Sequence, residues 1–250
     1  MKLFSVIGIT KSGKTTTIEN IIRELRKRRY TVGSVKEIHF EAFAIDTPGS
    51  NTDRHRKAGS QLVTARGNYE TDILYDRRLK LPEIMRHYDF DYVVLEGVTD
   101  TCAPKIITAH NTEEVDERLD GTVFAISGKL ANSMREYKGL PVISAITECE
   151  RLVDLVIEKV FERLPDVADE CCSACGYTCT QLTERILAGK AAREDCRISD
   201  GRIALQIDGR EIPIVPFVQK ILYNAVTGVV KELDGYRENG EITVTIKGKL

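Results

Sequence analysis

The sequence predicts an α/β fold, in which a mostly parallel sheet with flanking helices carries a phosphate-binding loop, followed by a small α+β module with a cysteine-rich segment. Three observations lead to this prediction. The pattern G-x-x-x-x-G-K-T at residues 8–15 stands between a strand-like and a helix-like stretch. Strand-length and helix-length apolar patterns alternate as far as residue 164, as they do in α/β proteins. Beyond Pro165 the composition changes, and five of the seven cysteines lie between residues 171 and 196.

The glycine pattern at residues 8–15 is the signature of a P-loop NTPase. Gly8 and Gly13 let the backbone curl so that successive N–H groups point at a polyphosphate, and the following helix adds its positive end. Lys14 supplies a positive charge for the outer phosphates, and the Thr15 hydroxyl is the usual Mg²⁺ ligand. The alternative is an ordinary glycine turn, which the flanking strand and helix disfavour. The loop residues expected to bind nucleotide are Gly8, Thr10, Lys11, Ser12, Gly13, Lys14, Thr15 and Thr16.

The composition limits the kinds of partner. The 250 residues suffice for one large domain or for a domain with a small module, and 42% apolar residues provide a core. Since 36 Lys and Arg stand against 38 Asp and Glu, we expect neither nucleic acid nor a membrane as partner. No apolar run approaches the roughly 20 residues of a membrane span. A cleaved signal peptide would remove the glycine loop, so we expect a cytoplasmic protein without a disulfide framework.

The first part of the chain predicts short strands and helices around one irregular segment. We expect strands at residues 3–7, 31–36, 61–65 and 72–75, and helices at residues 16–29 and 81–88. The opening strand–helix–strand order indicates a parallel sheet. Residues 37–60 show little periodicity, and a long irregular segment beside a phosphate loop is more often functional than idle.

A buried strand at residues 91–95 ends at Glu96, which Gly97 follows. In P-loop enzymes such a carboxylate holds magnesium or positions the attacking water. The alternative is a surface glutamate at a strand end, which Gly97 disfavours because glycine allows close backbone approach. Further strands are expected at residues 105–109, 122–127 and 142–146, and helices at residues 113–119 and 148–164. Ligands bind at the carboxyl ends of parallel strands, where Glu96 and Ser127 both lie.

The cysteines after residues 165–170 have the spacing of metal ligands. The run Cys172-x2-Cys175-x3-Cys179-x16-Cys196 surrounds a short amphipathic pattern, and we expect Cys175 and Cys179 on one helical face because they are four residues apart. Four thiolates bind either zinc or a 4Fe-4S cluster. Zinc modules usually contain two short cysteine pairs. Here three cysteines lie close together in the sequence and the fourth is distant, which favours the cluster. Unliganded core cysteines are the third alternative, and Cys171 is an alternative ligand to Cys172.

The C-terminal residues predict a small unit of their own. Strands at residues 203–207 and 210–214 flank Asp208-Gly209, a turn typical of tight hairpins. Residues 215–233 repeat apolar side chains at helical spacing, and residues 242–246 alternate like a last strand. So small a unit needs another element to pack against. We therefore expect it to pack on the cysteine segment, giving domains at residues 1–165 and 166–250.

Several ordered motifs in the first domain occur together in one known family. They are GITKSGKTT at the start, Val35-Lys36 leading to His39, FAIDTPG at residues 43–49, DRHRKAG at residues 53–59, and VLEG at residues 94–97. With these motifs the chain resembles the molybdopterin-guanine dinucleotide biosynthesis protein B (MobB) family. The resemblance implies that the chain binds GTP, hydrolyses it weakly and forms a homodimer. It also implies that the chain assists attachment of a guanine nucleotide to molybdopterin, with molybdopterin or a molybdopterin-transferring protein as partner.

The resemblance assigns roles to individual residues. It implies that Gly13, Lys14 and Thr15 bind phosphate and Mg²⁺. It implies that Asp46 and Glu96 belong to the metal shell or position the attacking water, and that His39, Arg54 and His55 contact nucleotide or pterin phosphate. The catalytic set would then be Lys14, Asp46 and Glu96. Two departures concern the pterin side: no second histidine stands beside the first, and Val-Thr-Asp follows Gly97 in place of an aromatic–lysine pair.

Two further functions compete with the leading hypothesis of a GTP-binding accessory protein of molybdenum or tungsten cofactor biosynthesis. The cysteine run is similar to small four-iron domains of corrinoid and carbon monoxide metabolism proteins, which supports a metallocentre-maturation NTPase as the alternative. A small-molecule kinase would need a catalytic base, for which the sequence shows no signature. The Asn-Lys-x-Asp box that usually reads guanine is absent, so the guanine preference rests on the resemblance.

Overall fold

The computed structural model describes residues 1–40, 43–166, 175–196, 203, 205–207, 210–212, 214, 216–237 and 242–246. The chain forms two compact units, Met1–Asp166 with Cys179–Arg193 and Val167–Thr178 with Glu194–Leu250. Each is described by itself, and the division into domains at residues 1–165 and 166–250 stays a prediction. Among the described helices, none has the length and apolar character that crossing a membrane requires.

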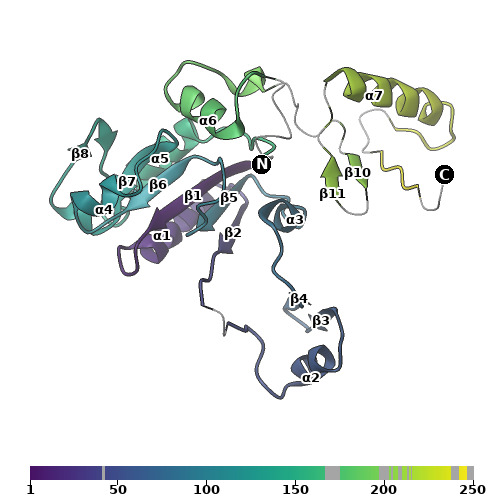
Figure 1. Ribbon diagram of the computed structural model, residues 1–250, viewed down its shortest axis with the longest axis horizontal. Helices are drawn as coiled ribbons and strands as arrows, with labels where there is room; N and C mark the ends of the chain where they lie inside the picture. The colour runs from purple at the N-terminus through teal and green to yellow at the C-terminus, as the bar shows by residue number, and fades with distance from the viewer. Residues whose placement is uncertain are drawn as a thin grey trace. The chain divides into compact units, whose positions relative to one another are not determined.

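The first unit is built on a five-stranded sheet with the order β2-β5-β1-β6-β7. Its strands are β2 (Val32–Lys36), β5 (Tyr92–Glu96), β1 (Lys2–Gly8), β6 (Lys105–Thr108) and β7 (Val123–Ser127), with β1 in the centre (Figure 1). Every pairing in the sheet is parallel. The predicted α/β class is therefore confirmed, and the carboxyl ends of all five strands lie along the same edge of the sheet.

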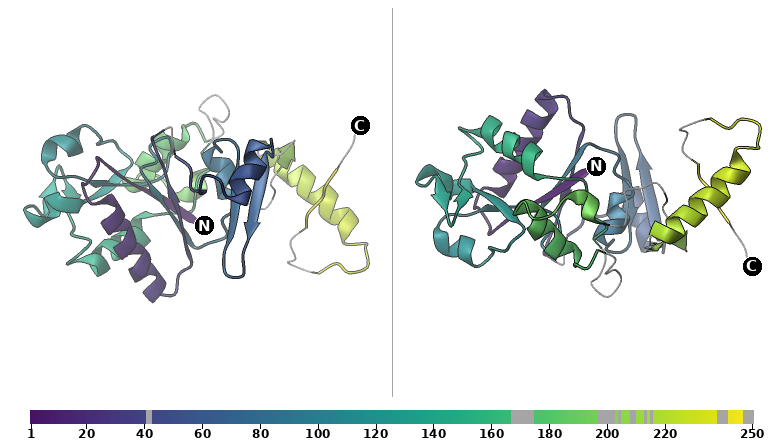
Figure 2. Two further views of the ribbon diagram at one scale, coloured as in Figure 1. Left: turned by 90° about the horizontal axis from the view of Figure 1, so that it is seen from below. Right: turned by 90° about the horizontal axis from the view of Figure 1, so that it is seen from above.

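Helices cover both faces of this sheet. The side chains of its strands point alternately to the two faces, and both faces are apolar. On one face α1 (Lys14–Lys27) and α5 (Cys149–Lys159) pack on Phe4 and Val6 of β1, and Figure 2 shows α1 in purple against the strands from two sides. The other face carries α3 (Leu81–Met85), α4 (Thr112–Asp116) and the 3₁₀ helix η1 (Gly128–Asn132).

Smaller elements complete the first unit. They are α2 (Asn51–Lys57), the hairpin β3 (Leu62–Arg66) and β4 (Thr71–Tyr75), the short pair β8 (Glu136–Tyr137) and β9 (Leu140–Pro141), and α6 (Cys179–Leu187). β3 and β4 pair antiparallel with Arg66 opposite Thr71, which confirms the strands predicted at residues 61–65 and 72–75. The side chain of Ser50 accepts a hydrogen bond from the Asp53 N–H and so caps α2 at its start.

The second unit contains β10 (Leu205–Ile207), β11 (Arg210–Ile212) and α7 (Pro216–Val230), and the 3₁₀ helix η3 (Arg193–Asp195) lies where the two units meet in sequence. Ile207 pairs with Arg210 in an antiparallel ladder, which confirms the predicted hairpin strands. Its two turn residues lie outside the described residues. The helix predicted at residues 215–233 is confirmed as α7, which ends earlier than predicted, at Val230.

Several predicted elements are wrong or too long. Residues 142–146 form no regular strand: Val142 makes one bridge to Ile126, and the Ser144 hydroxyl then accepts hydrogen bonds from the next N–H groups and turns the chain. The predicted strand at residues 242–246 is absent in the described chain, and Ile246 is 76% exposed. The helix predicted to reach residue 164 ends with α5, because Val160 is extended and Glu162 bridges to Lys2. The helices predicted at residues 81–88 and 113–119 end earlier, with α3 and α4.

Candidate nucleotide-binding site

The loop between β1 and α1 is shaped by close contact with β6. Gly8 has φ 151°, and a Cβ atom there would lie 2.2 Å from the Thr108 carbonyl oxygen, so only glycine fits. The buried Ser12 hydroxyl is hydrogen-bonded to the Thr108 hydroxyl at 2.8 Å and donates to the Ile9 carbonyl oxygen at 2.8 Å. These contacts hold the loop against β6, and other residues of the loop line a cavity.

A second backbone contact joins the loop to the segment after β7. Gly128 has φ 80°, and a Cβ atom there would lie 2.4 Å from the Ser12 carbonyl oxygen. A Cβ atom on Gly13 would lie 3.2 Å from the Gly128 Cα. The Lys129 N–H also donates to the Ser12 carbonyl at 3.3 Å. The phosphate loop and the start of η1 therefore form one packed backbone surface.

Lys14 is the first residue of α1 and lies over the loop. Its Nζ donates to the carbonyl oxygens of Gly8 at 2.8 Å and Ile9 at 2.6 Å. Burial lowers the pKa of Lys14, the negative charge of Glu96 opposes this, and the positive charges of Lys36 and Arg118 add to the lowering. An anionic ligand placed here would raise the pKa of Lys14 again, because it favours the charged ammonium.

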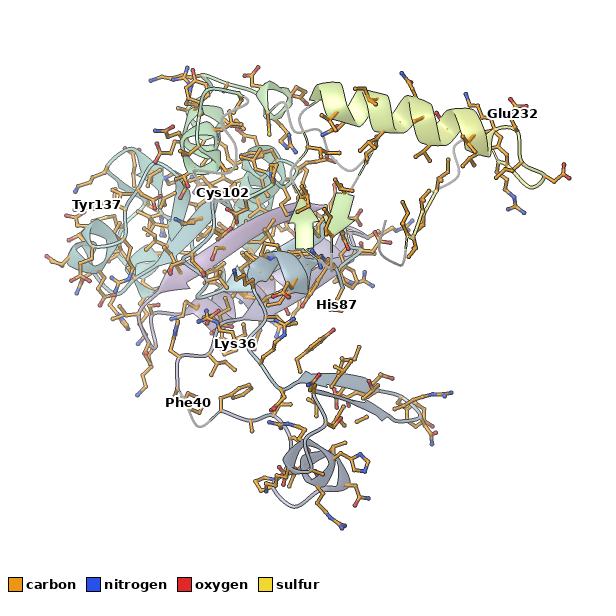
Figure 3. All side chains as sticks on the ribbon, turned by 45° about the vertical axis from the view of Figure 1, so that its right-hand side comes forward. Lys36, Phe40, His87, Cys102, Tyr137 and Glu232 are labelled. Atoms are coloured by element: carbon orange, nitrogen blue, oxygen red, sulfur yellow. The ribbon has the colours of Figure 1, made fainter. Side chains whose placement is uncertain are left out.

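Glu96, at the carboxyl end of β5, gathers two partners from other elements. Its Oε1 accepts a hydrogen bond from the Thr15 hydroxyl at 3.0 Å and forms an ion pair with Lys36 Nζ at 2.5 Å. The side chain is 14% exposed, and it lines the cavity described below. Strand order explains this meeting, because β5 lies between β1, which leads to Thr15, and β2, which ends in Lys36 (Figure 3 labels Lys36).

These groups line one cavity of about 890 Å³. Its glycine-loop wall comprises Ile7, Gly8, Ile9, Thr10, Lys11, Gly13, Lys14, Thr15, Thr16 and Thr17, and its remaining walls Lys36, Glu37, His39, Glu96, Gly97, Thr99, Arg118, Gly128, Lys129, Asn132, Ser144, Ala145 and Ile146. A cavity of this size accommodates a nucleoside triphosphate. It lies at the carboxyl ends of the strands, where parallel sheets bind ligands.

The structure brings most predicted site residues together. Of the nucleotide-binding residues expected from the sequence, all the loop residues except the buried Ser12 line the cavity, together with His39. Asp46, Arg54 and His55 do not line it. The Asp46 carboxylate instead accepts hydrogen bonds from the hydroxyls of Ser50 at 2.8 Å and Thr52 at 2.9 Å. In the described chain Asp46 therefore stabilises the start of α2.

Sequence reasoning missed several charged and polar residues of the cavity. Arg118 follows α4, and its guanidinium donates to the Glu114 carbonyl at 2.9 Å and the Glu117 carboxylate at 2.8 Å. Lys129 and Asn132 come from η1. The one available signal was that η1 follows directly on Ser127, a strand end already expected near a ligand.

The cysteine segment is described only in part. Cys171 and Cys172 lie outside the described residues, whereas Cys175, Cys179 and Cys196 lie within them. Gly176 has φ 81° and α6 begins at Cys179, so the prediction that Cys175 and Cys179 share a helical face is wrong. Among the described residues no three His, Cys, Asp or Glu side chains converge as a metal site.

Comparison with known proteins identifies the family. Residues 3–129, just over half of the chain, match the family described as Molybdopterin guanine dinucleotide synthesis protein B. The chain belongs to the MobB family. The match spans the glycine loop, Glu96 and the start of η1, so the walls of the cavity come mainly from the MobB region.

Relatives from both archaea and bacteria carry MobB-type names. A molybdopterin-guanine dinucleotide biosynthesis adapter protein of Methanocaldococcus jannaschii is 26% identical, with 98% of this chain and 97% of that protein covered. The adapter protein of Haemophilus influenzae is 29% identical over 58% of this chain and 87% of its own length. The crystal structure of Bacillus subtilis MobB covers 65% of this chain and all of its own, with a TM-score of 0.54 and 24% identity, which supports the fold. The archaeal relative thus matches the MobB region and the cysteine-containing region alike.

Proposed function

We propose that the chain is a GTP-binding adapter in the biosynthesis of a molybdenum or tungsten cofactor. It binds GTP in the cavity above the glycine loop, hydrolyses it weakly, and assists attachment of a guanine nucleotide to molybdopterin. Molybdopterin, or a protein that transfers it, is the partner, and the chain acts as a cytoplasmic homodimer. The names of the relatives support the pathway.

The observation that carries the proposal is the meeting of Lys14, Thr15, Lys36 and Glu96 in one cavity. Backbone N–H groups and two ammonium groups favour a polyphosphate. The Thr15 hydroxyl and Glu96 carboxylate lie 3.0 Å apart, and two converging oxygen atoms fit Mg²⁺, which prefers oxygen ligands. These two residues would hold the ion, which would neutralise charge that develops on the phosphates.

The rest of the chemistry belongs to side chains around the phosphates. Lys14 releases the carbonyls of Gly8 and Ile9 and binds the outer phosphate oxygens. Arg118 adds a further positive charge to the same cavity. Lys129 and Asn132 also line the cavity, and we assign them to contacts with the base. Arg54 and His55 stay proposed contacts for nucleotide or pterin phosphate, and Asp46 stays a proposed residue of the metal shell or attacking water.

Two measurements test this function: the preference of the chain for GTP over ATP, and its effect on the guanylylation of molybdopterin. With Mg²⁺ present, we expect calorimetric titration to give tighter binding of GTP than of ATP by at least about tenfold, or about 1.4 kcal/mol. Adding the chain to a molybdopterin guanylyltransferase should raise the yield of the dinucleotide cofactor. Equal affinity for ATP and GTP, or no change in yield, would contradict the adapter function.

We also propose that Cys172, Cys175, Cys179 and Cys196 bind a 4Fe-4S cluster, with zinc as the alternative metal. The support is their spacing, since the described cysteines alone do not build a metal site. No step of nucleotide binding depends on this group.

Anaerobically purified protein should be brown and contain about four iron and four sulfide per chain. Changing any one of the four cysteines to serine should abolish the colour, whereas Cys149→Ser should keep it. Colourless protein with one bound zinc would contradict the cluster, and protein with no metal would contradict both.

A further inference from the structure

Ile146 is an apolar side chain that lines the nucleotide cavity and yet remains accessible to water. It is 74% exposed, whereas Ile7 and Ala145 on the walls of the same cavity are 4% and 5% exposed. An isolated exposed isoleucine is ordinary on a protein surface. Two features distinguish Ile146: the turn that holds it, and its separation from the charged end of the cavity.

The turn that carries Ile146 is attached to β7 and closed by a buried serine. The Ile143 N–H donates to the Ile126 carbonyl oxygen of β7 at 2.9 Å. The Ser144 hydroxyl then accepts hydrogen bonds from the N–H groups of Ile146 and Thr147, both at 3.3 Å, and Ser144 is 7% exposed. Because this serine closes the turn, the backbone of Ile146 is held in place beside the cavity.

The ion pair of the cavity lies on the other side of the phosphate loop. In the strand order β2-β5-β1-β6-β7, Lys36 and Glu96 end β2 and β5, while the turn at Ile146 adjoins β7. Figure 1 shows β2 and β7 at opposite edges of this sheet. Three strand spacings, or roughly 14 Å, separate β5 from β7. We therefore expect Glu96 and Ile146 to contact different parts of a bound nucleotide.

We propose that Ile146 packs against the flat face of the nucleotide base, while the phosphates extend toward Lys14 and Glu96. This inference rests on the proposed function, in which the cavity binds GTP. A phosphate group is a hydrated anion and gains nothing from an apolar neighbour, whereas the face of a base leaves water when an isoleucine covers it. Since every base has such a face, Ile146 raises the affinity for GTP and ATP alike, and Lys129 and Asn132 contact the edge of the base.

Replacing Ile146 by serine should weaken binding of both GTP and ATP about tenfold and leave binding of inorganic tripolyphosphate unchanged within about twofold. Calorimetric titration of the full chain with each of these three ligands, with Mg²⁺ present, measures the effect. Ile146→Leu should keep the parental affinities within about threefold, because leucine restores the apolar area. Ile246→Ser is the matched control, since Ile246 is 76% exposed and does not line the cavity.

The chain contains no tryptophan, which permits a direct second measurement. In Ile146→Trp we expect the tryptophan fluorescence to change when GTP saturates the cavity and to stay constant with tripolyphosphate, because only the nucleotide brings a base against the indole ring. Ile246→Trp should respond to neither ligand.

If the parental chain bound neither GTP nor ATP, the proposed function would fail and the role of Ile146 would fail with it. Four results in a chain that binds GTP would overturn the role of Ile146 alone. They are parental affinity for GTP in Ile146→Ser, a loss confined to one of the two nucleotides, an equal loss of tripolyphosphate binding, and fluorescence of Ile146→Trp that does not respond to GTP.

Discussion

Replacing Lys14 by alanine is expected to abolish tight binding of nucleoside triphosphates. Lys14 is positioned over the glycine loop by hydrogen bonds to the carbonyl oxygens of Gly8 and Ile9, where we propose that it binds the outer phosphates. A hydrogen bond to a charged group contributes about 1.5–3 kcal/mol, so a lysine that contacts two phosphate groups accounts for affinity losses of 100-fold or more, or about 2.7 kcal/mol.

The fold should survive this substitution, because both carbonyl groups line the open cavity and water can replace the lysine. Calorimetric titration with GTP and thermal unfolding would be measured on the same preparation. Lys27→Ala is the control: it removes the same charge from the far end of α1, where Lys27 forms surface ion pairs with Glu24 and Glu150. If the Lys14 variant bound GTP as tightly as the parent, the glycine loop would not be the phosphate site.

Replacing Glu96 by glutamine should lower GTP hydrolysis much more than GTP affinity. The amide keeps the shape of the side chain but loses the charge that pairs with Lys36 and faces Thr15. A carboxylate that orders magnesium or water acts mainly in the transition state. We expect turnover at saturating GTP to fall at least about 100-fold, with a change in dissociation constant of less than about threefold.

Steady-state turnover and equilibrium binding must both be measured, since only their difference identifies a transition-state role. Glu19→Gln, on the exposed side of α1 beside Arg23, is the control for loss of a negative charge. A Glu96 variant with parental turnover would assign this residue to holding Lys36 in place.

The parts of the fold that could be predicted from the sequence are those with local signals. The glycine loop and the strand that ends at Glu96 could each be located, because each pattern is contained within a few consecutive residues. Their meeting could be expected too, because parallel strands present their carboxyl ends on one edge.

The errors arose where an apolar pattern had more than one structural explanation. Residues 142–145 are buried in the core without forming a strand, and apolar content alone does not separate these states. Residues 242–246 have strand-like alternation but no pairing strand in the described chain. Arg118 and Lys129 carry no motif, and only the tertiary fold reveals that they line the cavity.

The contact between Gly13 and Gly128 also restricts how this site can diverge during evolution. Because a Cβ atom on Gly128 would lie 2.4 Å from the Ser12 carbonyl, any larger residue there would displace the phosphate loop while altering the segment beyond it. In the proposed function Lys129 and Asn132 contact the base, so we expect substitutions of these two side chains to change which base is accepted. Such substitutions keep both glycines, so under this proposal base preference can change while the backbone of the phosphate loop is retained.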